Sequence, residues 1–95
     1  MIDVPKPLFP LGQIVATPGA LAALEASSQS PSDLLRQHVH GDWGCVDDED
    51  REANDLALQD GSRIISAYML DTDQKLWIIT EADRSSTCLL LPEEY

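Results

Sequence analysis

The chain has 95 residues, 43% of them hydrophobic, and its seventeen acidic and six basic side chains give a net charge of -11. This length suits one domain with a single core, and the apolar content is that of a folded protein rather than a disordered one. Because such a charge repels polyanions and attracts basic surfaces, we expect the partner to be a basic protein surface and expect no direct contact with nucleic acid.

Residues 1–10 are predicted to form an extended N-terminal arm, because Pro5, Pro7 and Pro10 restrict the backbone there. The opening Met-Ile-Asp-Val-Pro has neither the basic start nor the apolar run of a signal peptide, and no apolar stretch of the chain reaches membrane-spanning length. We therefore expect a cytoplasmic protein that does not bind membranes.

Two Ser/Thr-Pro pairs mark helix starts. After a short strand over residues 13–16, Thr17-Pro18 and Ser30-Pro31 each supply an N-cap followed by proline at the first helical position. The first helix should end at Ser27-Ser28 and the second at Gly41, since glycine commonly stops a helix.

The third predicted helix runs from about Asp48 to Gln59, with Asp47 as its cap and Gly61 as its stop. We expect Ala53, Leu56 and Ala57 to face the core. This region holds most of the negative charge, because eight acids and the single base Arg51 give residues 42–60 a net charge of -7. The acids are Asp42, Asp47, Asp48, Glu49, Asp50, Glu52, Asp55 and Asp60.

Three apolar or β-branched runs follow, over residues 63–70, 75–81 and 87–91, and short polar turns join them. Such turns favour consecutive antiparallel strands. The predicted fold is therefore a single compact α+β domain over residues 1–95, in which a short N-terminal strand and three helices precede a three-stranded antiparallel β-meander. Trp77 lies in the middle of the central strand, so we expect its ring to be largely buried and its replacement by alanine to cost about 3–5 kcal/mol.

Three motifs resemble a family of small bacterial proteins from plasmids and other mobile elements. The motifs are His38-x-x-Gly41-Asp42-Trp43-Gly44, Gly61-x-Arg63-x-x-Ser66-Ala67-Tyr68, and Trp77-Ile78-Ile79-Thr80-Glu81-x-Asp83-Arg84-Ser85-x-Thr87-x-x-Leu90-Leu91-Pro92-Glu93-Glu94-Tyr95. The resemblance covers residues 8–95 and implies a mobile-element context. The chain has no glycine-rich cofactor loop and no Asn-Pro-Pro-Tyr-type motif, so we expect no cofactor and no methyltransferase activity.

The candidate partner-binding residues are the acids of this region. They are Asp42, Asp47, Asp48, Glu49, Asp50, Glu52 and Asp55, with Trp43, Asp83 and Arg84 as possible loop contacts. The plain alternative is that the acids form a solvated helix face. A metal site at His38-x-His40-x-Asp42-x-x-Cys45 has suitable ligand types, but the spacing matches no closed site, so we predict no metal.

Three functions fit this pattern. The first is an inhibitor of a host defence nuclease, of anti-CRISPR or anti-restriction type, whose carboxylates imitate the phosphates of nucleic acid. The second is a small barnase-like or RelE-like ribonuclease, although the net charge opposes binding of a polyanion. Its acid, base and phosphate contacts would come from His38 or His40 with Arg63, Tyr68, Arg84 and Thr87. The third is an adaptor or antitoxin-like module, acting as a monomer or a homodimer.

Overall fold

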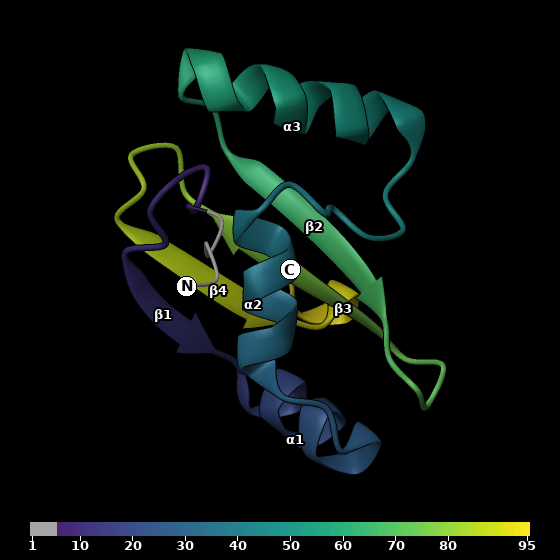
Figure 1. Cartoon of the computed structure of the whole chain (residues 1–95). Coiled ribbons are helices and arrows are strands. Elements are labelled where there is room, and N and C mark those ends of the chain that lie inside the picture. The colour runs from purple at the N-terminus through teal and green to yellow at the C-terminus, as the bar shows by residue number, and fades with distance from the viewer. Residues whose placement is uncertain (1–5) are drawn as a thin grey trace, which may run out of the picture.

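The computed structural model describes residues 6–95, which form a four-stranded sheet and three α-helices (Figure 1). In chain order the elements are β1 (Gln13–Ala16), α1 (Pro18–Ser27), α2 (Pro31–Val39), α3 (Asp48–Asp60), β2 (Ile64–Met69), β3 (Lys75–Thr80), β4 (Ser86–Leu90) and the 3-10 helix η1 (Pro92–Glu94). Part of the predicted extended arm, and the opening segment used to judge a signal peptide, lie outside the described residues. Residues 6–10 form neither helix nor strand.

The helices begin at the predicted caps. The Thr17 hydroxyl accepts the Ala20 N–H at 3.1 Å, and the Ser30 hydroxyl accepts the Ser32 N–H at 3.2 Å. Helix α3 is capped by Asp47, and it ends at Gly61 in the left-handed conformation, with φ of 78°. These boundaries are set by local backbone chemistry, because each cap satisfies N–H groups that a helix leaves unpaired at its start.

The sheet differs from the prediction. Strands β2, β3 and β4 are consecutive and antiparallel, but β1 adds to β4 in parallel, in the order β1-β4-β3-β2. The sheet is therefore four-stranded and mixed, and the prediction of a three-stranded antiparallel meander is wrong. Local turn signals predict hairpins, whereas the β1–β4 pairing joins segments about 70 residues apart and has no local signature.

Helices α1 and α2 cover one face of the sheet. The buried side chains there alternate along the strands, as the period-2 pattern predicts, and include Tyr68, Leu76, Ile78 and Leu89. Burying each large aliphatic side chain contributes about 1.5–3 kcal/mol, so this layer is the main source of stability.

The opposite face carries Trp77, whose exposure is intermediate, so its ring is partly covered and does not belong to the fully buried core. Its ring meets the ring of Tyr95 edge to face at 5.6 Å between centroids, and Arg63 donates to the Tyr95 hydroxyl. The buried indole is that of Trp43, which is 4% exposed in a second core cluster with Phe9 and Ile64. A central strand position does not ensure full burial, because α1 and α2 cover the other face of the sheet, while Tyr95 and the short η1 are what lies against β3 here.

Helix α3 packs beside the free edge of β2. The Asn54 side chain donates to the Ile65 carbonyl at 2.7 Å and accepts the Ile65 N–H at 3.1 Å, so one amide takes the place of a neighbouring strand. Asn54 and Ala57 are the buried residues of the helix. The expectation that Ala53 and Leu56 face the core is wrong, because the helix contacts the strand edge through a polar side chain that an apolar pattern does not reveal.

A loop covers the next part of the same edge. The Ala67 N–H donates to the Trp43 carbonyl at 3.0 Å, and the Cys45 N–H donates to the Ala67 carbonyl at 2.7 Å. Gly44 lies between them with φ of 76°, and a Cβ there would collide with the Ala67 carbonyl. Only glycine fits this approach without strain, which gives a structural reason for the second glycine of Gly41-Asp42-Trp43-Gly44.

Replacement of Asn54 by alanine should lower the free energy of unfolding by about 1–3 kcal/mol, because two backbone groups of Ile65 lose their partner. The measurement is urea denaturation of the variant beside Gln59→Ala, an amide-to-alanine change at an exposed position of the same helix. Equal losses in the two variants would show that Asn54 does not anchor α3 to the strand.

Candidate functional site

The acids of α3 divide into two groups. Counting the cap residue Asp47, four of them make contacts within the fold. Asp47 accepts the Asp50 N–H at 2.8 Å, Asp48 pairs with Arg51 at 3.2 Å, Asp55 accepts the Trp43 indole N–H at 3.1 Å, and Asp60 accepts the Ser62 N–H at 2.9 Å. The others show no side-chain hydrogen bond or ion pair with the part of the chain that the structure describes. These are Glu49, Asp50 and Glu52.

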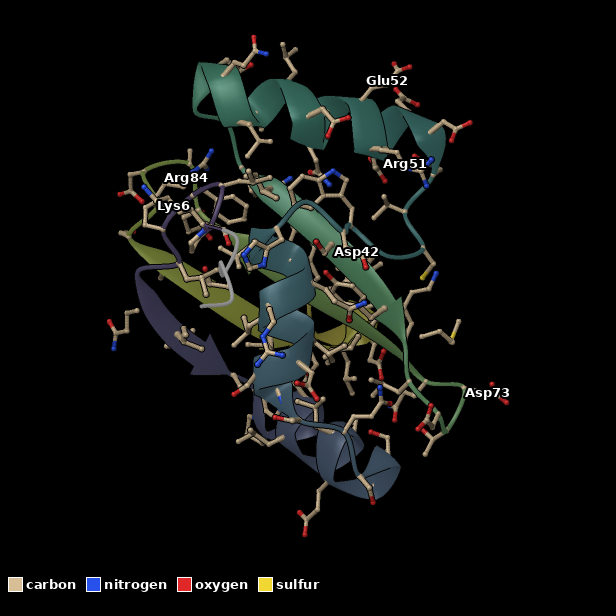
Figure 2. The ribbon with its side chains drawn as sticks, in the orientation of Figure 1. Lys6, Asp42, Arg51, Glu52, Asp73 and Arg84 are labelled. Atoms are coloured by element: carbon tan, nitrogen blue, oxygen red, sulfur yellow. The ribbon has the colours of Figure 1, made fainter. Side chains whose placement is uncertain are left out.

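The outer face of α3 is defined by the positions opposite Asn54 and Ala57. At 3.6 residues per turn these are positions 48, 49, 52, 55, 56 and 59, and all of them are exposed. Figure 2 shows Glu52 on the side of α3 away from the sheet. We call Asp48, Glu49, Glu52 and Asp55 the acidic face.

Asp42 is not part of the acidic face. Its carboxylate accepts from the Gln37 amide at 3.0 Å and from the Gly44 N–H at 3.2 Å, and its carbonyl accepts the Tyr68 hydroxyl at 2.5 Å. The Tyr68 contact holds the loop between α2 and α3 against β2, while the Gln37 contact joins it to α2 and the Gly44 contact lies within the loop. Asp42 therefore shapes the loop, although its side chain is exposed.

The possible loop contacts do not form one surface. Trp43 is buried, and the Asp83 carboxylate accepts the Ser85 N–H at 3.0 Å within its own turn. Arg84 donates to the Ser62 carbonyl at 2.7 Å and to the Ala57 carbonyl at 3.0 Å. Its guanidinium thus satisfies carbonyls at the C-terminal end of α3, where the helix dipole favours a cation.

His38 is fully buried, and its ring nitrogens contact two strands. Nδ1 lies 2.5 Å from the Ser66 hydroxyl of β2, and Nε2 lies 2.9 Å from the Thr80 hydroxyl of β3. Thr80 lies 2.8 Å from the Thr87 hydroxyl of β4, and Thr87 donates to the Leu11 carbonyl at 2.7 Å. We call this set the histidine–hydroxyl chain.

The direction of the histidine–hydroxyl chain determines the tautomer of His38. A carbonyl can only accept, so Thr87 uses its proton on Leu11 and must accept from Thr80. Thr80 then accepts from Nε2–H, and Nδ1 accepts from Ser66. With a neutral His38 ring, every member of the chain has a hydrogen-bond partner. A second ring proton, at Nδ1, would face the Ser66 hydroxyl proton, and that hydrogen bond would be lost. His38 is a site candidate in the sequence, but its hydroxyl partners lie 28 and 42 residues away and have no local signature.

Burial, with a smaller effect of the Arg84 charge, lowers the pKa of His38 to about 4. A ribonuclease would need an accessible acid or base, and this ring is 0% exposed. Three other side chains considered for that chemistry also make hydrogen bonds within the fold. Arg84 donates to backbone carbonyls, Tyr68 donates to the Asp42 carbonyl, and Thr87 belongs to the histidine–hydroxyl chain. The structure does not bring them to a shared open site.

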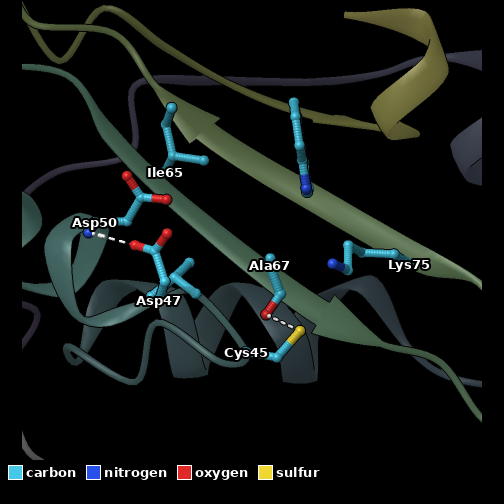
Figure 3. A pocket seen from close by; sticks show the side chains of 8 residues that line it. Cys45, Asp47, Asp50, Ile65, Ala67 and Lys75 are labelled. Atoms are coloured by element: carbon cyan, nitrogen blue, oxygen red, sulfur yellow. Dashed lines mark hydrogen bonds between the residues drawn. The ribbon is translucent and has the colours of Figure 1, made fainter.

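A groove of about 300 Å³ lies between the loop before α3 and the outer surface of β2 and β3 (Figure 3). Ile65, Ala67 and Trp77 give it an apolar lining. Asp47 and Asp50 lie at the α3 end, and Lys75 lines the side formed by β3. The groove could receive a side chain of a bound protein. The groove has no signature in the sequence, because its lining comes from three separate segments.

Among residues 6–95, no group of three or more His, Cys, Asp or Glu side chains could hold a metal ion. His38 and His40 in particular point to different partners, since His38 binds Ser66 and the His40 Nδ1 lies 2.7 Å from the Arg36 carbonyl. In the same described part of the chain, no helix is both long enough and apolar enough to cross a membrane.

The fold should lose stability as the pH falls from 6.5 towards 4. The unfolded chain binds a proton at His38 below about pH 6.5, while the folded chain resists it until about pH 4, so protonation favours unfolding by up to about 3 kcal/mol. In His38→Gln this part of the pH dependence should disappear, although the variant is less stable overall.

The measurement is the free energy of unfolding between pH 4 and 8 for wild type, His38→Gln and the matched control His40→Gln. The control keeps His38 and both hydroxyl partners, so its curve should have the wild-type slope. A His38→Gln curve with the wild-type slope would contradict the assignment of a buried, neutral histidine.

Comparison of the chain with models of known protein families, with curated proteins and with solved structures finds no match. The geometry of the acidic face, the groove and the histidine–hydroxyl chain is therefore the basis for a functional proposal.

Proposed function

We propose that the protein binds a basic protein surface through the acidic face of α3 and thereby competes with nucleic acid for that surface. The observation that carries this proposal is the exposure of the acidic face along α3, which is held to the fold by the buried Asn54 and Ala57 on its other side. Of the four acids on this face, Asp48 alone has an ion pair with a described base, Arg51. The face thus offers carboxylates that the fold itself does not neutralise.

The acids form a row of negative charge along α3, with a wider axial spacing than that of DNA phosphates. Asp48, Glu52 and Asp55 follow one another at about 6 and 4.5 Å along the helix axis, given a rise of 1.5 Å per residue. A DNA strand carries one phosphate per about 3.4 Å of its axis. Arginine and lysine side chains form charge-assisted hydrogen bonds with carboxylates as they do with phosphates. A groove that neutralises a phosphate backbone could therefore accept α3.

The proposed setting is the bacterial cytoplasm, with the protein encoded on a plasmid or other mobile element. The resemblance of the His38–Gly44 and Trp77–Tyr95 motifs to mobile-element proteins supports this setting. A mobile element benefits from blocking a host defence nuclease, so the proposed partner is a nucleic-acid-binding complex of CRISPR or restriction type. An adaptor would also bind through the acidic face, but it would leave nucleic-acid binding by the partner unchanged.

Neutralising the acidic face should weaken binding to the partner without unfolding the protein. In the triple variant Asp48→Asn, Glu49→Gln, Glu52→Gln we expect at least about a tenfold loss of affinity, because charge complementarity is removed, while exposed charges contribute little to stability. Wild-type binding should also weaken as salt rises, since exposed charges are screened over about 8 Å at physiological ionic strength.

The control variant is Glu25→Gln, Asp71→Asn, Glu93→Gln, which removes three charges at exposed positions outside α3. Immobilised wild type and both variants are used to capture proteins from host cells, and the affinity of the purified captured protein is then measured with and without competing DNA or RNA. Equal losses of affinity in the two triple variants would mean that the partner responds to the net charge of the protein and not to the acidic face. Simultaneous binding of the partner to nucleic acid and to this protein would reject the decoy and favour the adaptor.

A further inference from the structure

The two edge strands of the sheet differ in what lies beside them. The β2 edge is covered at Ile65 by the Asn54 amide and at Ala67 by the loop containing Gly44. Along the far side of β1, no strand of the described residues is paired. An uncovered strand edge exposes backbone donors and acceptors that can pair with another strand, and proteins usually protect such edges with charges, proline or a covering segment.

The free groups of β1 can be identified from its pairing with β4. Gln13 N–H donates to the Ser85 carbonyl at 2.9 Å and Thr17 N–H to the Leu89 carbonyl at 3.0 Å, so alternate residues 13, 15 and 17 face β4. The N–H and C=O groups of Ile14 and Ala16 therefore face the open side. Ile14 and Val15 are also 51% and 42% exposed, which is unusual for β-branched apolar side chains.

The charge distribution points to what can occupy this edge. Between Lys6 and Glu25 the chain has no charged residue, and β1 lies in the middle of this neutral stretch. The strand order places β1 at one edge of the sheet and β2, with α3 beside it, at the other. In Figure 1, α3 and β1 lie on opposite sides of the molecule. The residues of β1 thus add no charge to this edge; the Glu94 carboxylate, which accepts the Thr17 hydroxyl, lies just beyond its end, and the most negative part of a second copy stays at the far edge.

We propose that β1 pairs with β1 of a second copy, antiparallel and about a two-fold axis at Val15. In this register Ile14 of each copy faces Ala16 of the other, and both are the residues with free backbone groups. Each of these two pairs can form two hydrogen bonds, as in the hydrogen-bonded pairs of an antiparallel ladder. The two Val15 side chains lie directly opposite each other.

The resulting dimer has one continuous eight-stranded sheet, with the two acidic helices at its far ends. This arrangement keeps the most negative regions of the two copies apart. It also presents two acidic faces in one assembly, so a partner with two basic sites within reach would be bound with a raised effective concentration. Self-association does not depend on the proposed function, because β1 and α3 lie at opposite edges.

The experiment measures mass by analytical ultracentrifugation of the full chain over a range of concentrations. Wild type should move from 10.4 kDa towards twice that mass. In Val15→Lys, and separately in Val15→Glu, self-association should weaken by about tenfold or more, because like charges then face each other across the axis. A mixture of the two variants should form dimers again, since opposite charges now meet. The control Leu56→Lys changes an exposed apolar residue of α3 and should remain as dimeric as wild type.

The dependence of the dimer on salt concentration is a second measurement. Added salt should strengthen the dimer, because it screens repulsion between two negative chains, whereas it should weaken binding of a basic partner. A wild type that stays at 10.4 kDa at all concentrations would overturn the proposal. So would a dimer that Val15→Lys leaves intact, or a mixture of the Lys and Glu variants that stays monomeric. If β1 of the monomeric protein instead paired with a peptide strand of another protein, that strand would be the occupant of the β1 edge in place of a second copy.

Discussion

The histidine–hydroxyl chain is the constraint on which the rest of the structure depends. It joins α2 through His38 to β2, β3 and β4, and it ends on the carbonyl of Leu11 in the segment before β1. The four side chains of this chain, His38, Ser66, Thr80 and Thr87, are all 0% exposed, so any member left unpaired would carry its full desolvation cost. A shift of one residue in any strand would break the chain, so it selects one register for the sheet and one position for α2.

The second organising feature is the separation of charge from the core. Helix α3 is fixed through Asn54 and Ala57 on one side, by the Asp55 carboxylate on the Trp43 indole and by Arg84 at its end, so the other acids of its outer face are not needed for packing. That face can carry carboxylates at little cost to stability, because exposed charges are well solvated. The fold thus separates the groups that determine stability from those proposed to bind a partner. Residues 42–60 carry -7 of the net charge of -11, so most of the remaining repulsion lies in this part of the molecule.

Much of the secondary structure could be predicted from the sequence. Thr17-Pro18, Ser30-Pro31 and Asp47 mark the helix starts, because capping depends on neighbouring backbone groups. The alternation of residues 64–70 divides β2 into two faces, since successive side chains in a strand point to opposite sides, but it does not identify which face the helices cover. The acidic face could also be anticipated, because the charges and the helical period are both properties of the local sequence.

The remaining features depend on contacts between distant segments. The parallel pairing of β1 with β4, the amide of Asn54 on the edge of β2, and the burial of Trp43 rather than Trp77 each depend on what lies on the far side of a strand or helix. The same is true of His38, which resembles a surface helix-end histidine until Ser66 and Thr80 are placed beside it. The sequence by itself determined the helices, the antiparallel strands and the location of the charge, since these follow from neighbouring residues. Only the tertiary structure decided which strand edges are covered and which polar groups are buried, because both depend on segments that are far apart in the chain.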